Sequence, residues 1–576
     1  MSTMQKRNKQ GYFQAILLLV VSLTLTLASC SKDYLERSPS DLIDEKKVFS
    51  NLNNAEAFLN NAYREIPQLV YRNDNSGSSF FNLGSGTDES AQMWGHHLTT
   101  MDFNNGNWNP VSFPLFWTWQ SYYQAIRRIN LFLKNYELIP EEVSSQTSSS
   151  RKNRMLGEAY VLRGYYYFLL YSMWGKVPIL TNPILPGGAE NIYLERSSID
   201  VLVAQIEQDL LEGEKHLPNI YSDADYGRVT SLAAASIRSR LWLYFASPLS
   251  NPSNDAARWE KAETFAKVAK EKAELQGHLL SLTPSGNRKA YELIFLEINN
   301  PETLWASFSP NNGDGHYWDN WGGSLGQGGW YGEGPIQDLV DAYETKLGEL
   351  PVLGYNANGT PIANPASGFD PAKPFENRDD RFYQTILYHG ASWKGRLVNV
   401  SPGGADYSTD KPRVNYFWKK YMLEQHNLYT GNGMAQRRFI LFRLSELYLN
   451  FAEARNERLS SPDAEVYASV NVLRARAGLP NLPTNLTKLE MRDRIQRERR
   501  VEFAMENHRF FDVRRWKIAE IVDNKQVRRI NVSSSGEFTY PIWGNRIFDR
   551  SKHYLFPIPQ TEIEKSAGIL SQNEGW

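Results

Sequence analysis

The sequence predicts a mostly α-helical protein, a degenerate helical-repeat scaffold that carries an irregular, loop-rich inserted subdomain. Apolar residues recur at steps of three and four in the N-terminal and C-terminal parts of the chain, which is the period of an α-helix. From about residue 281 to 437 this period fades, and Gly and Pro multiply. At 576 residues the chain also exceeds what one hydrophobic core usually holds. These three observations favour a helical array interrupted by loops.

The central element is a helix within residues 151–180. Its apolar stripe consists of Met155, Ala159, Leu162, Tyr166, Leu169 and Met173. Gly157 and Gly164 lie seven residues apart, where missing side chains let a second helix come close, and Gly175 with Pro178 ends the segment. Several tyrosines cover its other faces. We therefore expect a buried helix that other helices surround.

Further helices are predicted on the same period. Their ranges are 53–66, 116–136, 198–217, 229–246, 256–276, 440–458, 465–477 and 488–516. In the range 256–276, Trp259 is followed by alanines at helical spacing, as in helix pairs of tetratricopeptide units. No 34-residue period is readable, so the pattern predicts a degenerate repeat scaffold.

The N-terminus is typical of an exported lipoprotein. Lys6, Arg7 and Lys9 precede an apolar stretch at 15–28 that is too short for a stable membrane span. It ends at Ser29-Cys30, and Cys30 is the only cysteine, so the stretch resembles a lipobox with Cys30 as the lipidated residue. The alternative is an ordinary signal peptide followed by a chance cysteine. Residues 31–36 resemble the short acidic tag of surface lipoproteins in Bacteroidetes.

Five regions follow from these patterns. They are a removed signal peptide (1–29), a lipidated tether (30–50), an N-terminal helical-repeat part with a binding loop (51–280), a loop-rich aromatic subdomain (281–437) and a C-terminal helical part that completes the scaffold (438–576).

Charge and cysteine content exclude several classes of function. The 63 Lys and Arg nearly cancel the 64 Asp and Glu, whereas nucleic acid binding needs concentrated positive charge. A single cysteine excludes an internal disulfide framework and a cysteine-based metal site. The sequence has no HExxH motif, so we predict no metal site and no cofactor, and only calcium binding by an Asp-rich loop stays open.

No residue pattern predicts catalysis. Glu498 and Glu502 lie four apart among several arginines, which indicates a structural ion-pair network. His508 has no Ser or Cys nucleophile motif near it and is expected to be packed in the interior. We therefore predict that the protein is not an enzyme.

Five motifs, in order, resemble the SusD/RagB family of outer-membrane nutrient-binding lipoproteins. They are GEAYVLRGYYYFLLYSMWGKVPIL, RLSELYLNFAEARNE, VNVLRARAGLP, IQRERRVEFAMENHRFFDVRRW and the ending from YLFPIPQTEI to LSQNEGW. The resemblance implies a tetratricopeptide-containing α fold, a lipid anchor at Cys30 in the outer membrane, and no enzymatic activity. It also implies delivery of a nutrient, usually an oligosaccharide, to a partner TonB-dependent transporter of the SusC type.

Two stretches have the aromatic and polar residues that a sugar site needs. A sugar ring stacks on an exposed aromatic ring while Asn, Asp, Gln or Arg bind its hydroxyls. One stretch is Thr87–Trp94, where a TDE run followed by Trp resembles a starch-binding member of the family; the other, 316–335, packs three Trp, two Tyr and seven Gly into a predicted loop. The predicted ligand-binding residues are Trp94, Trp321, Tyr317, Trp318, Trp330, Asp88 and Asn320.

Other interpretations stay open at this point. Trp94 could fill the core, and one or two of the loop tryptophans could anchor the loop itself. The ligand could be a peptide, as in the RagB branch, instead of a glycan. A surface glycosidase is supported only by the number of carboxylates.

Overall fold

The computed structural model describes residues 45–68, 71–72, 80–93, 100–142, 150–183, 194–221, 225–284, 289–308, 313–410, 413–425 and 438–576. The predicted signal peptide lies outside them. The helices are α2 (Glu45–Phe49), α3 (Leu52–Asn60), α4 (Thr100–Asn105), α5 (Phe116–Lys134), α6 (Arg151–Trp174), α7 (Ile199–His216), α8 (Ser231–Ala246), α9 (Ala256–Leu275), α10 (Ala290–Leu296), α11 (Gly313–Gly322), α12 (Gln337–Ala342), α13 (Asp380–Thr385), α14 (Leu444–Arg458), α15 (Ala464–Arg476), α16 (Lys488–Glu502), α17 (His508–Arg515), α18 (Ala519–Val522) and α19 (Gln560–Lys565).

The strands are short. They are β1 (Tyr71–Arg72), β2 (Phe80–Phe81), β3 (Ser90–Gln92), β4 (Thr303–Phe308), β5 (Glu333–Pro335), β6 (Val352–Tyr355), β7 (Pro361–Ala363), β8 (Ile386–Leu387), β9 (Ser392–Trp393), β10 (Arg396–Leu397), β11 (Phe417–Trp418), β12 (Arg438–Arg443), β13 (Gln526–Arg528), β14 (Asn531–Val532), β15 (Phe538–Thr539) and β16 (Ile542–Asn545).

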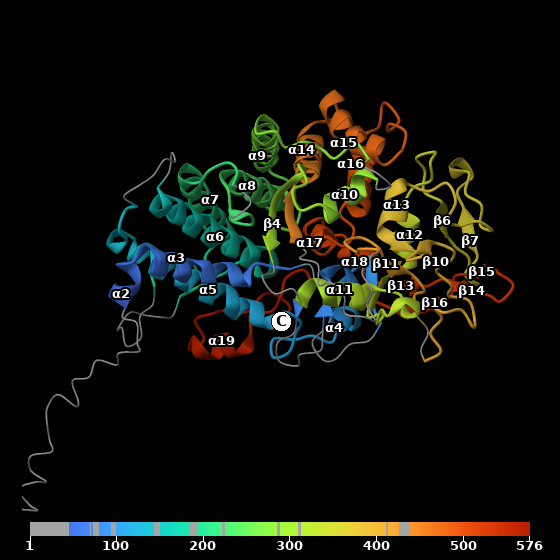
Figure 1. The fold of residues 1–576 in the computed structure, drawn as a ribbon, viewed down its shortest axis with the longest axis horizontal. Coiled ribbons are helices and arrows are strands. Elements are labelled where there is room, and N and C mark those ends of the chain that lie inside the picture. The colour runs from blue at the N-terminus through green and yellow to red at the C-terminus, as the bar shows by residue number, and fades with distance from the viewer. Residues whose placement is uncertain are drawn as a thin grey trace, which may run out of the picture.

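The helices form a serial array. Each of α5, α6, α7 and α8 packs on the helix that follows it, and α14 packs on α9, α15 and α16. In Figure 1 these helices occupy one side and the top of the molecule, while β6, β7 and β13–β16 occupy the opposite side. The mostly helical fold class is thus confirmed. The tetratricopeptide character of the pairs and the five region boundaries stay predictions.

Helix α6 is the buried centre that the sequence predicts. A Cβ built on Gly157 would lie 2.9 Å from the carbonyl oxygen of Gly213 in α7, and one built on Gly213 would lie 2.8 Å from that of Gly157. The missing side chains therefore let α6 and α7 come into backbone contact. The helix ends at Gly175, whose φ of 70° disfavours other residues.

Two predicted C-terminal helices differ from the structure. The range 440–458 begins as strand β12, which pairs antiparallel with β4. The range 488–516 is broken between α16 and α17, because Met505 and Asn507 adopt positive φ. This break receives the segment before β3, since the side chain of Asn507 accepts a hydrogen bond from the backbone N–H of Leu83, at 2.8 Å.

The predicted loop at 316–335 is also partly wrong. Residues Gly313–Gly322 form α11, and the chain then turns back through glycines to β5. A Cβ on Gly329 would lie 2.2 Å from the carbonyl carbon of Gly323, so neither position of this turn has room for a side chain. The turn brings the backbone N–H of Trp330 to 2.5 Å from the carbonyl oxygen of Asn320.

The predicted ion-pair network is confirmed. Arg381 contacts Glu498 at 2.6 Å and Glu502 at 2.8 Å, and Arg443 contacts Glu502 at 2.6 Å. These side chains are almost completely buried, so the charges hold α13, α16 and the end of β12 in one arrangement. His508 stacks on Phe503 with 4.5 Å between ring centroids, and burial holds its pKa well below the usual value, which confirms a packed histidine.

The C-terminal segment fastens onto the central helix. The indole of Trp174 donates to the carbonyl oxygen of Pro557 at 2.9 Å, and the Asn573 amide donates to the carbonyl oxygen of Trp174 at 2.9 Å.

Among the described helices, none combines the length and apolar character needed to cross a bilayer.

Candidate functional site

The predicted site residues fall into three groups. Trp94 and Cys30 lie outside the described residues, and of Tyr317 only the backbone, within α11, is described. Asp88, Trp318, Asn320 and Trp321 are buried. Trp330 is exposed, with 37% of its surface accessible.

Asp88 is a structural anchor between β3 and the C-terminal helices. Its two carboxylate oxygens accept from Nε and Nη2 of Arg509, at 2.7 and 2.8 Å, and Arg500 approaches to 3.0 Å. Burial by itself raises the pKa of Asp88, but the positive charges of Arg500 and Arg509 outweigh it and hold that pKa below its usual value. Because the side chain is 1% exposed, the expectation of an accessible hydroxyl partner at Asp88 is wrong.

The neighbouring Glu89 lies in a different environment. It is fully buried, and its Oε1 accepts from the backbone N–H of Met505 at 3.1 Å. Burial raises the pKa of Glu89 to about 8. Glu333 on the paired strand β5 is also buried, and burial raises its pKa to about 7. Both carboxyls are closed off from any ligand outside.

Trp318 and Trp321 pack inward from α11. They are 2% and 1% exposed, and Asn320 between them is 6% exposed. The ring of Trp321 lies against Gly332, where an added Cβ would meet it at 2.4 Å. The expectation that these rings are held out on a loop is wrong, because the segment is helical and its inner face joins the core. Neither tryptophan has an exposed ring face on which a ligand could stack.

Two aromatic side chains are exposed in the described part of the chain, Trp330 at 37% and Tyr407 at 39%. One guanidinium connects their neighbours: Arg413 donates to the carbonyl oxygen of Tyr331 at 3.1 Å and to the hydroxyl of Ser408 at 3.2 Å. We call Trp330, Tyr407, Ser408 and Arg413 the Trp330 patch.

A second link holds the two segments of the Trp330 patch together. The buried carboxylate of Asp406 accepts from the backbone N–H of Gly326 at 3.1 Å and from Arg396 at 2.7 Å. The turn that carries Trp330 is therefore fixed against the turn that carries Tyr407. The patch is a supported surface, which suits a ligand platform.

Sequence reasoning missed Tyr407 and Arg413. A signal was present, because Tyr407 is the single aromatic residue in the Gly- and Ser-rich run SPGGADYSTDK at 401–411. This signal is weaker than that of 316–335, because the run has one aromatic residue and two glycines. The position of Arg413 between the two segments is a tertiary feature with no local signal.

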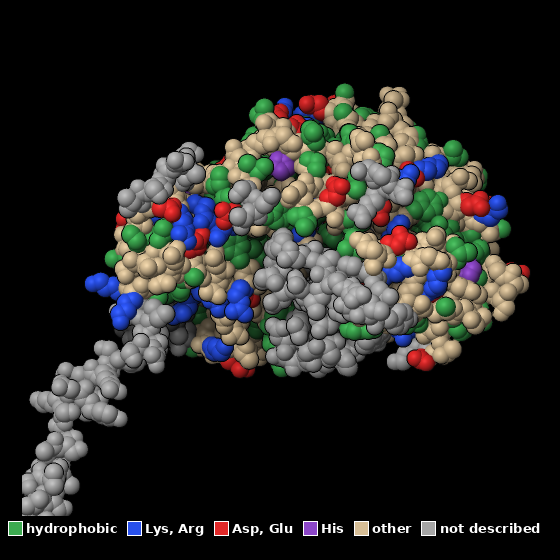
Figure 2. All heavy atoms as spheres, viewed as in Figure 1, with side chains coloured by type: hydrophobic (Ala, Val, Ile, Leu, Met, Phe, Trp, Pro, Cys, Tyr) green, Lys and Arg blue, Asp and Glu red, His purple; other side chains and the backbone are tan. Residues whose placement is uncertain are grey.

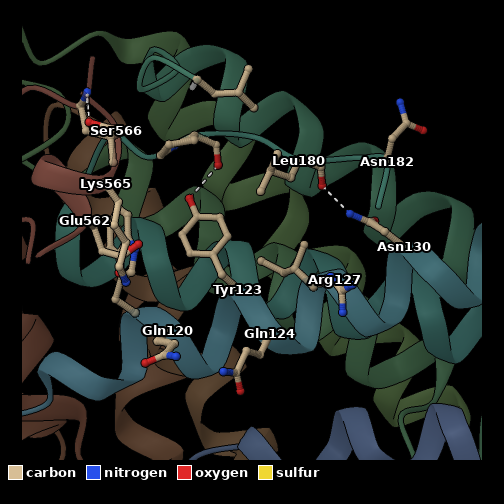
Figure 3. Close-up of a pocket in the computed structure, with 15 residues that line it drawn as sticks. Gln120, Tyr123, Gln124, Arg127, Asn130, Leu180, Asn182, Glu562, Lys565 and Ser566 are labelled. Carbon is tan, nitrogen blue, oxygen red and sulfur yellow. Dashed lines mark hydrogen bonds and ion pairs between the residues drawn. The ribbon is translucent and has the colours of Figure 1, made fainter. Parts of the chain in front are cut away.

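A hollow of 340 Å³ lies between α5, residues 178–182 and α19 (Figure 3). Tyr123 and Asn130 point from α5 toward the 178–182 segment, and they donate to the carbonyl oxygens of Pro178 and Leu180 at 2.7 and 2.8 Å. These two hydrogen bonds hold residues 178–182 against α5. The side chains of Tyr123 and Asn130 therefore have a structural role in this hollow.

Charge is mixed over the surface. In Figure 2, basic and acidic side chains lie interspersed among the described atoms of the face shown. Within the described residues, no group of three or more His, Cys, Asp or Glu could hold a metal ion.

Comparisons with known proteins agree with this organisation. The SusD family model matches residues 292–576, and a model described as "starch-binding associating with outer membrane" matches residues 33–243. A SusD-like protein of Formosa agariphila is 25% identical over 567 residues, which are 93% of this chain and 96% of that protein.

Solved structures share the fold. A SusD-like protein from Bacteroides fragilis has a TM-score of 0.74 and 26% identity, over 94% of this chain and 100% of that one. A laminarin-binding SusD-like protein has a TM-score of 0.59 and 24% identity, over 91% of this chain and 99% of that one. The two family models together match most of the sequence. The five motifs lie in the helical array and in the C-terminal segment that contacts α6. This chain therefore belongs to the SusD/RagB family.

Proposed function

We propose that this protein is an outer-membrane lipoprotein that captures oligosaccharides at the cell surface. The family membership supports glycan binding, as does the description of the model matched over residues 33–243. A protein of similar fold binds laminarin. In this proposal Cys30 carries the lipid anchor, and the captured glycan passes to a SusC-like TonB-dependent transporter.

The Trp330 patch carries the proposal. An indole and a phenol ring lie exposed on two turns that Arg413 and Asp406 fix to each other. A pyranose ring can stack its C–H face on either aromatic ring, because burial of apolar surface favours the contact. Ser408 accepts from Arg413 and keeps its own proton to donate to a sugar hydroxyl. Trp94 and Tyr317 stay predicted contacts of the same ligand.

The proposal includes no catalytic step. Glycoside hydrolysis needs two carboxyl groups that flank the substrate, one of them with a raised pKa. Burial raises the pKa of Glu89 and of Glu333, but both are fully buried and cannot reach a substrate. A binding protein fits this arrangement better than a glycosidase.

Binding of residues 31–576 to an array of oligosaccharides and a matched panel of peptides tests the proposal. We expect one glycan class to bind, with no release of shorter sugars on prolonged incubation. Binding of peptides alone would favour the RagB-type function, and turnover of any polysaccharide would identify an enzyme. Either result would contradict the proposal.

A further inference from the structure

Arg529 brings a second guanidinium to the Trp330 patch. It lies in the link between β13 and β14, on the side of the molecule opposite the helical array (Figure 1). The backbone N–H of Ile530 donates to the carbonyl oxygen of Val414 at 3.3 Å. Arg529 and Arg413 each come directly before one of these two residues, so their segments lie side by side.

Both arginines act on the same tyrosine of this region. Burial raises the pKa of Tyr331, and the positive charges of Arg413 and Arg529 oppose that rise. Arg529 is also close enough to interact electrostatically with the hydroxyl of Tyr407, one of the two exposed rings of the patch. The two guanidiniums therefore lie beside the turns that carry the exposed rings.

No carboxylate in the described part of the chain neutralises these two charges. Neither Arg413 nor Arg529 forms an ion pair with a described residue. The nearby acid Asp406 is already paired with Arg396, at 2.7 Å. Asp410, exposed in the same turn, instead accepts from the hydroxyl of the preceding threonine at 3.4 Å. The described groups of the patch thus leave two positive charges in excess.

The two guanidiniums also keep hydrogen-bond donors for a ligand. Arg413 donates to Tyr331 and to Ser408, and a guanidinium has more N–H groups than these two bonds use. The side chain of Arg529 donates to none of the described residues. Partial burial lowers the pKa of Arg529, because the guanidinium loses water there. An anion beside it would compensate for that loss.

We propose that the sugar unit bound at the Trp330 patch carries a negative charge, as a carboxylate or a sulfate ester. A planar guanidinium binds two oxygens of such a group at once, which gives strong, charge-assisted hydrogen bonds. The ring of the same sugar can stack on Trp330 or Tyr407, both of which are exposed. This assignment rests on the proposed function of the patch and adds the charge class of its glycan.

An oligosaccharide array with matched neutral forms tests the charge of the ligand on residues 31–576. Neutral members are maltose, laminarin and cellulose oligosaccharides. Anionic members are oligogalacturonate, alginate oligosaccharides, chondroitin sulfate and a sulfated galactan. Methyl esterification neutralises a uronate and desulfation removes a sulfate, so the two treatments distinguish the two groups. We expect the tightest binder to be anionic and its neutralised form to bind about tenfold more weakly or less, by calorimetric titration.

The variant Arg529→Gln tests the protein side of the same contact. It removes a charge but no hydrogen bond to a described residue, so its melting temperature without ligand should stay unchanged. Binding of the anionic member should weaken about tenfold. Arg64→Gln, at an exposed arginine that follows α3 in the helical array, is the control and should keep full affinity. Full affinity of both Arg529→Gln and Arg413→Gln would overturn the inference.

Salt gives an independent measurement. Raising NaCl from about 0.1 M to about 1 M shortens the Debye length from about 10 Å to about 3 Å. Binding of the anionic member by the unmodified protein should therefore weaken, and by more than it does in Arg529→Gln. An affinity that is independent of salt would overturn the inference.

The remaining outcomes distinguish this inference from the proposed function. A neutral member that binds tightest and is lost in Trp330→Ala would overturn the charge assignment and leave glycan capture standing. An absence of binding by every array member would contradict both. Inorganic sulfate that binds as tightly as the best oligosaccharide would show a simple anion site and overturn the inference.

Discussion

At the scale of single residues, adjacent positions take opposite electrostatic roles. Asp88 is ionised between two arginines, whereas Glu89 next to it is buried with a pKa raised to about 8. A carboxyl whose pKa is higher in the folded than in the unfolded state binds a proton on folding between those two values. Its contribution to stability is therefore present below the unfolded value and is lost as the pH rises through the folded value.

Replacing Glu89 by Gln should flatten the pH dependence of stability. Between the ordinary pKa of 4.5 and about 8, the native protein loses stability as the pH rises, because the Glu89 carboxyl ionises in the unfolded chain but stays protonated in the folded interior. A neutral amide at position 89 removes the contribution of Glu89 to the slope of unfolding free energy against pH. A smaller slope remains, because the pKa of Glu333 is also raised. Urea unfolding of both proteins from about pH 5 to about pH 8 measures it. Glu271→Gln on the exposed face of α9 is the control, and equal slopes for Glu89→Gln and the unmodified protein would contradict this account.

The sequence indicated the residue types of the site better than their exposure. Trp330 is exposed as a platform residue should be, but Trp318 and Trp321, close by in sequence, are buried. Local sequence cannot distinguish them, because α11 and Gly332 bury Trp321 through contacts that form only in the folded chain. Asp88 was misread for the same reason, since its partners Arg500 and Arg509 lie more than four hundred positions away.

At the scale of elements, close helix packing rests on glycines. A Cβ on Gly164 of α6 would lie 3.2 Å from Leu210 Cγ and 3.3 Å from the carbonyl oxygen of Ile206, both in α7. These distances leave no room for a branched side chain. The pair α6 and α7 therefore depends on small residues as well as on apolar burial.

Replacing Gly164 by Leu should overpack this contact and lower the free energy of unfolding by about 1–3 kcal/mol. Denaturant unfolding followed by far-UV circular dichroism measures the change. Lys267→Leu, on the exposed face of α9, controls for the added leucine. An unchanged unfolding midpoint for Gly164→Leu would show that α6 is not the packing centre.

Helices whose apolar residues keep the helical spacing over several turns could be predicted from the sequence. Helices that break, and segments that change from strand to helix, could not. Helices α6, α7, α9 and α15 lie at or within a few residues of their predicted ranges. The turn between α16 and α17 was missed because Met505 and Asn507 adopt positive φ to receive a segment from residues 82–89. Strand β12 was missed because its partner β4 lies 130 residues earlier.

At the scale of the whole molecule, the N-terminal and C-terminal parts form one unit. The β4–β12 pair, the packing of α9 on α14 and the contact of Asn573 with Trp174 all join segments distant in sequence. The order of the five motifs in the sequence indicated that both parts belong to one family fold. Which distant segments contact each other is seen only in the folded chain. The outer-membrane lipoprotein account adds an anchor at Cys30 to this unit.

Replacing Cys30 by Ala should release the protein from the outer membrane, because the lipidated thiol would be absent. Membrane fractionation and immunoblotting measure the distribution, with Ser31→Ala as the control. The released protein should melt at the same temperature as residues 31–576. If Cys30→Ala still sediments with membranes, the lipid-anchor proposal is wrong.

The central claim is that the Trp330 patch binds the glycan, and calorimetric titration of Trp330→Ala and Tyr407→Ala tests it most directly. The ligand is the oligosaccharide found by array, and Leu353→Ala, at another exposed apolar position, is the control. Loss of a stacking ring should weaken binding at least about tenfold, or about 1.4 kcal/mol, while Leu353→Ala keeps full affinity. Full affinity in both aromatic variants would contradict the account and place the glycan elsewhere on the molecule.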